Sequence, residues 1–365
     1  MPATYVAARG GLFDHIKETA LATRAYGIHV TVTGKAGAFL DGLQAAGVDT
    51  LPSVLEHPDE AIAELGAKGP WDLIHTHPFA ARAFAVQAAK AWQVPLVATI
   101  HGWYLDDVQA WHQDASVIIG VTDAITDRLK AVPGVDPAAV RTIENHRKLT
   151  PDVARRANPS GRRTLLVVSR IDRDFAPVAQ LLDEFVTAAN DRGDRRWDVA
   201  IAGTGTGVRD LVATIARRWS HPGAPPISLL GWLDAAGLAV QYARAAAVIA
   251  PGRAAVDAMI SGIPTVMTRQ IGSYAMAPFG DARSALYGRP GERVMGEDFF
   301  GACTRALDNP EIADEYSYAH RRIAELTFDP DSLTRRLVAA YEVAALERFR
   351  QAPDTRPSSR SKNGG

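Results

Sequence analysis

The sequence predicts an α/β protein with two Rossmann-like domains, each built on a parallel sheet. Short runs of apolar and β-branched residues recur along the chain, and segments with helical spacing separate them. This alternation is typical of parallel sheets that helices cover on both faces. A polar stretch at residues 148–163 interrupts the alternation, which then resumes. The 365 residues therefore divide into two domains of ordinary size, whose sheets are expected to face each other across an interdomain cleft.

The first domain is predicted to span residues 1–150. Its buried strands are expected at residues 29–33, 71–75, 95–100, 116–121 and 140–143. Alanine-rich segments with helical spacing lie between them, at residues 14–26 and 79–92. Residues 151–163, which contain two prolines and a glycine, are predicted to be the linker.

The second domain is predicted to span residues 164–330. Its strands are expected at residues 164–169, 197–202, 227–230, 246–250 and 263–267. Its helices are expected at residues 177–190, 207–219, 235–245 and 254–261. A further helix is predicted at residues 331–350, and the polar tail 351–365 is predicted to be disordered.

The composition excludes several classes of protein. A net charge of −1 gives no basic field for nucleic acid, and residues 1–150 carry 12 basic against 16 acidic side chains, which disfavours docking on an anionic membrane. Cys303 is the single cysteine, so an internal disulfide and a cysteine zinc cluster are excluded. Neither a membrane span nor a signal peptide is recognisable, which predicts a cytoplasmic protein. The 33 arginines against 7 lysines are typical of a GC-rich bacterial genome.

Residues 250–266 have the pattern of a phosphate-binding turn. A predicted strand ends at Pro251 and Gly252, and a helix follows. The first turn of a helix offers unpaired N–H groups and the positive end of the dipole, and Arg253 adds a guanidinium. Asp257, one turn later, suits two vicinal hydroxyls such as those of a ribose. The alternative is an ordinary connection between strand and helix with a surface arginine and aspartate.

Eight segments together resemble the motifs of family 4 glycosyltransferases and their retaining GT-B relatives, in the family's order. They are Arg9-Gly-Gly11, Gly27-Ile-His-Val-Thr-Val32, Asp72-Leu-Ile-His-Thr-His77, Ala98-Thr-Ile-His-Gly102, Val168-Ser-Arg-Ile171, Ala202-Gly-Thr-Gly205, Leu230-Gly-Trp232 and the stretch from Asp257 to Val266. The resemblance implies a GT-B fold with an acceptor-binding first domain and a nucleotide-sugar-binding second domain. It also implies that the 331–350 helix crosses back to the first domain.

The resemblance assigns roles to individual residues. Arg170 would neutralise the diphosphate, and His101 would lie beside the anomeric carbon, so these two are the expected catalytic residues. The expected donor-binding residues are Gly10, Gly11, Arg170, Arg173, Gly203, Gly231, Gly252, Arg253, Ala254 and Asp257. A helix N-terminus and two arginines can stabilise the leaving group, so neither a metal nor a cofactor is expected. The expected partners are a nucleotide-sugar donor, with UDP favoured, and a small-molecule acceptor, and the oligomeric state is not predicted.

Three departures from the family's pattern leave alternatives open. Phe175 stands where the family has a lysine, the first acidic position of the donor motif is absent, and Ile143-Glu-Asn-His146 replaces the usual Pro-Asn-Gly. Arg173 or Arg253 could supply the missing cation. The alternatives are a non-catalytic sugar-nucleotide-binding subunit, or a nucleotide-sugar epimerase of the same architecture.

Histidines and aromatic residues follow two strands of the first domain. His75, His77 and His101 could form a metal triad, but no carboxylate partner is evident. The resemblance instead places His75 and His77 at the cleft floor, where they and Trp103 and Tyr104 would contact the acceptor. The alternative for the two aromatic residues is a loop packed on the domain core. The expected acceptor is a small natural product, such as an amino sugar, or a glycan intermediate.

The glycines at 203, 205 and 207 also suggest a dinucleotide site. Their spacing is Gly-x-Gly-x-Gly, whereas the dinucleotide fingerprint is Gly-x-Gly-x-x-Gly, so NAD is disfavoured.

Overall fold

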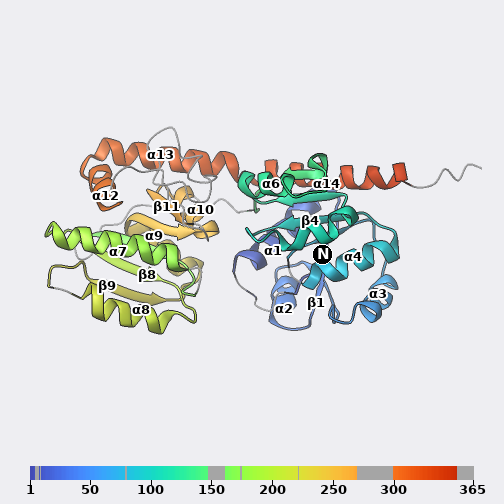
Figure 1. Ribbon diagram of the computed structural model, residues 1–365, viewed down its shortest axis with the longest axis horizontal. Coiled ribbons are helices and arrows are strands. Elements are labelled where there is room, and N and C mark those ends of the chain that lie inside the picture. The colour runs from blue at the N-terminus through green and yellow to red at the C-terminus, as the bar shows by residue number, and fades with distance from the viewer. Residues whose placement is uncertain are drawn as a thin grey trace, which may run out of the picture. The chain divides into compact units, whose positions relative to one another are not determined.

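The computed structural model describes residues 1–4, 8, 10–78, 80–146, 161–172, 175–220, 222–268 and 299–351. The chain divides into two compact units (Figure 1). Unit 1 comprises Met1–His146 and Asp331–Gly365, and unit 2 comprises Arg147–Pro330. Arg9, Arg173, residues 151–160 of the predicted linker and the predicted tail from residue 352 onward lie outside the described residues.

Unit 1 contains a four-stranded parallel sheet. Its strands follow the order β3 (Ile74–Thr76), β4 (Leu96–Ile100), β5 (Val117–Gly120) and β6 (Val140–Thr142). All residues of β4 and β5 are buried, as expected for apolar runs in a sheet with two covered faces. A separate parallel pair is formed by β1 (Thr31–Gly34) and β2 (Asp49–Pro52). Its larger helices are α1 (Gly11–Thr23), α2 (Ala38–Ala45), α3 (Pro58–Gly66), α4 (Ala80–Trp92) and α6 (Asp123–Lys130).

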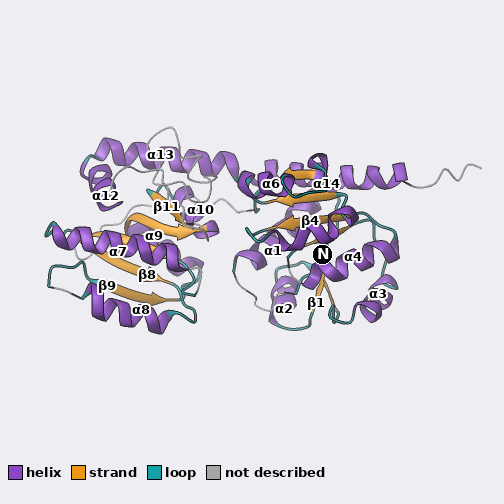
Figure 2. Ribbon diagram, viewed as in Figure 1, coloured by secondary structure: helices purple, strands orange, loops and turns teal. Residues whose placement is uncertain are grey.

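Unit 2 is built on a five-stranded parallel sheet in the order β11-β10-β7-β8-β9 (Figure 2). The strands are β7 (Arg163–Val168), β8 (Trp197–Ala202), β9 (Ile227–Gly231), β10 (Ala245–Pro251) and β11 (Thr265–Thr268). The helices are α7 (Ala176–Asp191), α8 (Val208–Thr214), α9 (Ala235–Arg244), α10 (Gly252–Ile260), α12 (Phe299–Asp308) and α13 (Pro310–Thr327).

Side-chain alternation along β7 divides the core of unit 2 between the two faces of its sheet. Leu165 and Val167 pack in one cluster with buried residues of α7, α8 and α12. Phe185, Trp197 and Phe300 form edge-to-face ring pairs in that cluster, with centroids 5.1–6.5 Å apart. Because the strands are held by parallel pairing and covered by helices, their carboxyl ends form one well-defined edge.

The C-terminal helix α14 (Pro330–Gln351) packs against the body of unit 1. Tyr341 bonds to His75, and Thr334 bonds to His146. Arg336 forms an ion pair with Glu144 at 2.7 Å. α14 therefore completes the domain that begins at the N-terminus.

The predicted α/β class with parallel sheets is confirmed. Sequence patterns missed strand β2 and helices α2, α3, α6, α12 and α13. β2 has no fully buried residue and ends in proline, so it lacks the apolar run typical of a strand in a parallel sheet. Across the described residues, no helix combines the length and apolar character needed to cross a bilayer.

Candidate functional site

The residues of unit 2 that are predicted to bind the donor, where the structure describes them, lie at the carboxyl edge of its sheet. Parallel strands end at the same edge, where ligands bind in open α/β sheets. Arg170 follows β7, Gly203 follows β8, Gly231 ends β9, and Gly252 follows β10 as the first residue of α10. Figure 2 shows the parallel strands of this sheet as orange arrows. The fold therefore brings together four segments that are far apart in the sequence.

The glycine turn after β8 packs directly on the backbone around Arg170. A Cβ on Gly203 would lie 1.8 Å from the carbonyl oxygen of Ser169, and one on Gly205 would lie 2.2 Å from that of Ile171. The amide of Ile171 donates to the carbonyl of Thr204 at 3.0 Å. These glycines are required for close packing of two backbones, which places Arg170 beside the turn.

Arg170 extends from this edge into solvent. Its side chain is 73% exposed, and its guanidinium lies 3.5 Å from the carboxylate of Asp172. Arg170 is the second residue after β7, so its position is set by the strand. An exposed guanidinium there could form bidentate hydrogen bonds with a diphosphate.

The N-terminus of α10 provides a second anion-binding element. The helix starts at Gly252, whose φ is +49°, and among the described residues no side chain caps its first turn. The hydroxyl of Tyr242 donates to the carbonyl of Ala254 at 3.1 Å and fixes this turn to α9. Arg253 and Asp257 are both half-buried. The first-turn amides and the helix dipole therefore favour an anion here.

Phe175 has a structural role. It is buried in the core of unit 2 and belongs to the same cluster as Leu165 and Trp197. Within the described residues, Arg170 and Arg253 are the predicted cations for the leaving group.

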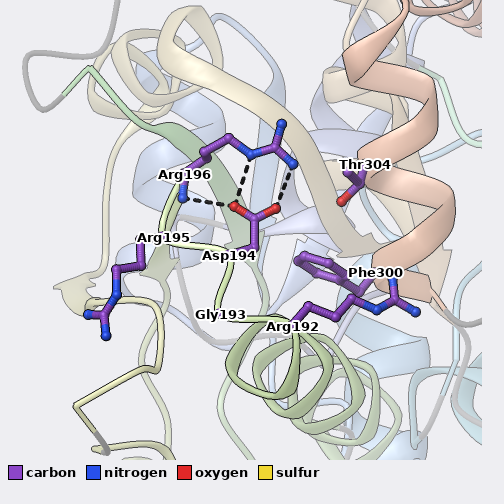
Figure 3. Close-up of a pocket in the computed structure, with 7 residues that line it drawn as sticks. All are labelled: Arg192, Gly193, Asp194, Arg195, Arg196, Phe300 and Thr304. Carbon is purple, nitrogen blue, oxygen red and sulfur yellow. Dashed lines mark hydrogen bonds and ion pairs between the residues drawn. The ribbon is translucent and has the colours of Figure 1, made fainter.

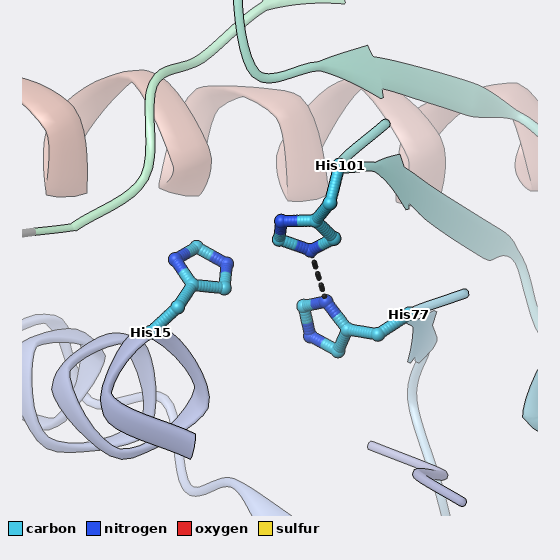
Figure 4. Close-up of side chains that lie close together, drawn as sticks. All are labelled: His15, His77 and His101. Carbon is cyan, nitrogen blue, oxygen red and sulfur yellow. Dashed lines mark hydrogen bonds between the residues drawn. The ribbon is translucent and has the colours of Figure 1, made fainter. Parts of the chain in front are cut away.

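In unit 1, the ends of β3 and β4 bring His77 and His101 together. Nδ1 of His77 lies 3.0 Å from Nε2 of His101. The ring of His15, on α1, is 5.3 Å from that of His77 and 4.9 Å from that of His101, measured between centroids. Figure 4 shows the His15 ring facing the other two. One nitrogen from each of the three rings lies within 4.8 Å of the others.

His77 is buried, whereas His101 is half-buried. Burial lowers the pKa of His77 well below its usual range, and the neighbouring His75 and His101 lower it further. The ring is therefore neutral at physiological pH. Its Nε2 has no hydrogen-bond partner among the described residues.

His75 is bonded through both ring nitrogens. Nδ1 lies 2.7 Å from the hydroxyl of Tyr341, and Nε2 lies 2.7 Å from the hydroxyl of Thr99. Burial lowers the pKa of His75 to about 3, so the ring is neutral, accepting one hydrogen bond and donating the other. This bonding gives His75 a structural role, and its contact with an acceptor stays a prediction.

The two aromatic residues after His101 differ in exposure. Trp103 is half-buried against the core of unit 1, and the guanidinium of Arg128 lies 4.7 Å from the centre of its ring system. Tyr104 is 75% exposed. Of the two, Tyr104 is the one available to a ligand without rearrangement.

The predicted glycines of unit 1 lie at the start of α1. Gly10 is the N-cap residue with φ +101°, which favours glycine, and Gly11 opens the helix. His15 follows Gly11 by about one turn, and sequence reasoning missed it. The spacing of the sequence could have indicated it. A helix that starts at Gly11 places His15 in its first turns, close to the glycines that are predicted to bind the donor.

A separate pocket of about 480 Å³ lies at the opposite edge of the unit 2 sheet, before β8 (Figure 3). Its lining residues are Arg192, Gly193, Asp194, Arg195, Arg196, Phe300 and Thr304. Arg196 is bonded to Asp194 through both carboxylate oxygens, at 2.7–2.9 Å. None of the predicted site residues lines this pocket.

Comparison with known proteins tests the resemblance. Residues 9–147, most of unit 1, match the model of Glycosyltransferase Family 4. The resemblance to family 4 glycosyltransferases is confirmed. Over 330 residues the chain is 26% identical to a glycogen synthase of Mycobacterium tuberculosis, covering 81% of this chain and 74% of that protein.

Two solved structures are similar to this chain over both units. A glycosyltransferase from Rickettsia africae gives a TM-score of 0.71 at 15% identity, covering 96% of this chain and 98% of the other. Anabaena HepE, in complex with UDP and glucose, gives 0.69 at 16% identity, covering 93% and 98%. At these identities the likeness establishes the GT-B fold.

Proposed function

We propose that this glycosyltransferase is a retaining enzyme that moves a sugar from a nucleotide diphosphate to an acceptor. The observation that carries the proposal is the position of Arg170, the Gly203 turn and the N-terminus of α10 at one edge of the unit 2 sheet. In this proposal the guanidinium and the helix end hold the diphosphate, and the carboxylate of Asp257 accepts from the ribose hydroxyls.

The chemical task is to stabilise a departing diphosphate and a sugar with oxocarbenium character. Fixed donors that point to the developing negative charge lower this barrier because they need no reorganisation during the reaction. The first-turn amides of α10 are such donors, and Arg170 and Arg253 are proposed to add guanidinium groups at the same edge of the sheet. His101 is proposed to act next to the reacting sugar.

UDP is the favoured carrier. The support comes from HepE, which was solved in complex with UDP and glucose, and from the family match of unit 1. The acceptor is proposed to bind to unit 1 near His77, Trp103 and Tyr104, and to be a small natural product or a glycan intermediate. A cytoplasmic location goes with this proposal.

Calorimetry with UDP tests the donor site. Arg170→Ala is expected to weaken binding by about tenfold to a hundredfold, because a charge-assisted hydrogen bond contributes about 1.5–3 kcal/mol. Arg195→Ala is the matched control, since Arg195 lies at the opposite edge of the same sheet and bonds to the carbonyl of Pro222. Equal UDP affinity in Arg170→Ala and the parent would refute the donor assignment.

The stereochemistry is tested with the donor sugar that gives turnover. NMR of the freshly formed product is expected to show the same anomeric configuration as the donor. A product with the inverted configuration would refute the retaining mechanism but would not affect the assignment of the donor site.

A second candidate is a non-catalytic subunit that binds a sugar nucleotide. The observation that favours it is the burial of Phe175 where the family has a lysine, because this removes one cation from the leaving-group site. Hydrolysis or transfer of a UDP-sugar by the purified chain, lost in His101→Ala, would exclude this candidate. Conversion of the donor into an epimer without acceptor would instead indicate an epimerase.

A further inference from the structure

We propose that His15, His77 and His101 form a binding site for a transition-metal ion, with Zn²⁺ as the best-suited cation. The three side chains come from α1 and from the ends of β3 and β4, so three different elements fix the site. Figure 4 shows the three rings around a common centre.

The distances are close to those of a metal site. One nitrogen from each ring lies within 4.8 Å of the other two, and Nδ1 of His77 lies 3.0 Å from Nε2 of His101. In a tetrahedral zinc site with metal–nitrogen distances of about 2.0–2.1 Å, ligand nitrogens lie about 3.3 Å apart. Small side-chain rotations therefore convert the present arrangement into a coordinating one.

The donor set selects the type of metal. All three ligands are imidazoles, which suit Zn²⁺, Cu²⁺ and Ni²⁺ rather than Mg²⁺ or Ca²⁺. Three protein ligands leave the fourth tetrahedral position for water or another small ligand, as in catalytic rather than structural zinc sites.

Hydrogen bonds to groups outside the trio hold three histidines of this region. Nδ1 of His15 accepts from the backbone amide of His146 at 3.3 Å. His75 uses both nitrogens for Tyr341 and Thr99. His146 uses Nδ1 for Thr19 and Nε2 for Thr334, at 3.2 Å each. These bonds fix the rings around the trio.

Metal binding requires one unprotonated nitrogen on each ring. A neutral imidazole carries one N–H and one lone pair, so His77 and His101 share a single proton across their 3.0 Å contact. A cation can take its place if that proton moves to another ring nitrogen. His77 has such a nitrogen in Nε2, which is buried and has no partner among the described residues.

Metal binding is tested on the full chain without a polyhistidine tag. Titration with ZnCl₂ is expected to give one site per chain, and Co²⁺ is expected to give the intense visible absorption of tetrahedral coordination. His101→Ala and His15→Ala are expected to weaken Zn²⁺ binding at least tenfold. His29→Ala is the matched control, because His29 is an exposed histidine of the same unit.

Folding of each variant is checked by circular dichroism. His101 is half-buried and tolerates substitution better than His15, so His101→Ala keeps the test valid if His15→Ala unfolds. Zn²⁺ affinity that is unchanged in a folded His101→Ala, or no binding by the parent chain, would overturn the metal site.

The site predicts a link to turnover that rests on the proposed function. His101 is proposed to lie beside the reacting sugar, so Zn²⁺ is expected to inhibit transfer, and a chelator to restore it. The metal site and the donor site can be refuted independently of each other. Zn²⁺ binding is measured without nucleotide, and UDP binding is tested through Arg170, which belongs to unit 2.

Discussion

The phenolic oxygen of Tyr341 lies 2.7 Å from Nδ1 of His75, and both side chains are buried. This bond joins α14 to β3, although Tyr341 and His75 lie 266 positions apart in the chain. His75 is held on its other side by Thr99 of β4. One imidazole thus connects the C-terminal helix with the neighbouring strands β3 and β4 of unit 1.

Tyr341→Phe should destabilise unit 1. The substitution keeps the ring but leaves a buried imidazole nitrogen without its partner, at a cost of about 1–3 kcal/mol in the free energy of unfolding. Urea unfolding followed by circular dichroism measures this cost. Tyr318→Phe is the matched control, because Tyr318 is 68% exposed and its substitution should change little. Equal effects of the two substitutions would show that the hydrogen bond contributes nothing.

Gly203→Ala should damage unit 2 and its donor site together. The new Cβ would lie 1.8 Å from the carbonyl oxygen of Ser169, in a backbone with φ +156°, so the turn must move away from Arg170. A loss of more than about 2 kcal/mol in stability is expected. In the folded fraction, UDP affinity measured by calorimetry should decrease.

Gly193→Ala provides the comparison for this change. Gly193 also has positive φ, at +62°, but a Cβ there meets nothing within 4 Å. Its cost should be about 1 kcal/mol, with UDP affinity unchanged. If both variants bind UDP equally well, the close backbone approach at Gly203 does not contribute to UDP binding.

His320 should make the stability of unit 2 depend on pH. Its Nδ1 accepts from the amide of Thr265 at 3.1 Å, and burial lowers its pKa from 6.5 to about 4. Above pH 6.5 the ring is neutral in both states. Between 6.5 and 4 the unfolded chain binds a proton that the folded chain does not, so stability decreases by up to about 1.4 kcal/mol per pH unit as the pH falls.

The variant His320→Gln should bind up to one proton fewer on unfolding between pH 6.5 and 4, so its stability should depend less steeply on pH. Thermal or urea unfolding at pH 4.5–7.5 measures it. His75, whose pKa is lowered to about 3, adds a similar slope in unit 1 that the variant does not remove. An unchanged pH profile in His320→Gln would contradict a neutral, buried His320.

Asp308→Asn should have a small, salt-dependent effect. Oδ1 of Asp308 accepts from Arg163 at 2.6 Å and from Arg196 at 2.9 Å. Burial alone would raise the pKa of Asp308, but the two guanidinium groups outweigh it and the pKa is lowered. Because the groups are partly exposed, the loss should stay at or below about 1 kcal/mol and shrink in 1 M salt. Asp314→Asn, at an exposed position of α13, is the control for unfolding measurements.

The carboxyl edge of the unit 2 sheet, where the donor is proposed to bind, could be predicted largely from sequence. The strands around residues 164–169 and 197–202 are long, apolar and followed by distinctive residues, Arg170 and Gly203. Their position at one edge follows from parallel pairing alone. The roles of these residues stay predictions, since they depend on a ligand.

The histidine cluster could be predicted only in part. His77 and His101 end adjacent strands, so their approach follows from the sheet. His15 joins them because α1 packs against that sheet edge, and no periodicity in the sequence encodes this packing. For the same reason the sequence could not indicate that Tyr341 is buried beside His75 and hydrogen-bonded to it.

The place of α14 in unit 1 has a consequence for biosynthesis. A ribosome finishes residues 147–330 before it makes the helix that carries Thr334 and Tyr341. Unit 2 can therefore acquire its core while the nascent chain is still growing, whereas unit 1 waits for the last segment to emerge. The unit that is translated first is thus completed last, and a premature stop near residue 330 would leave His75 and His146 without their partners Tyr341 and Thr334.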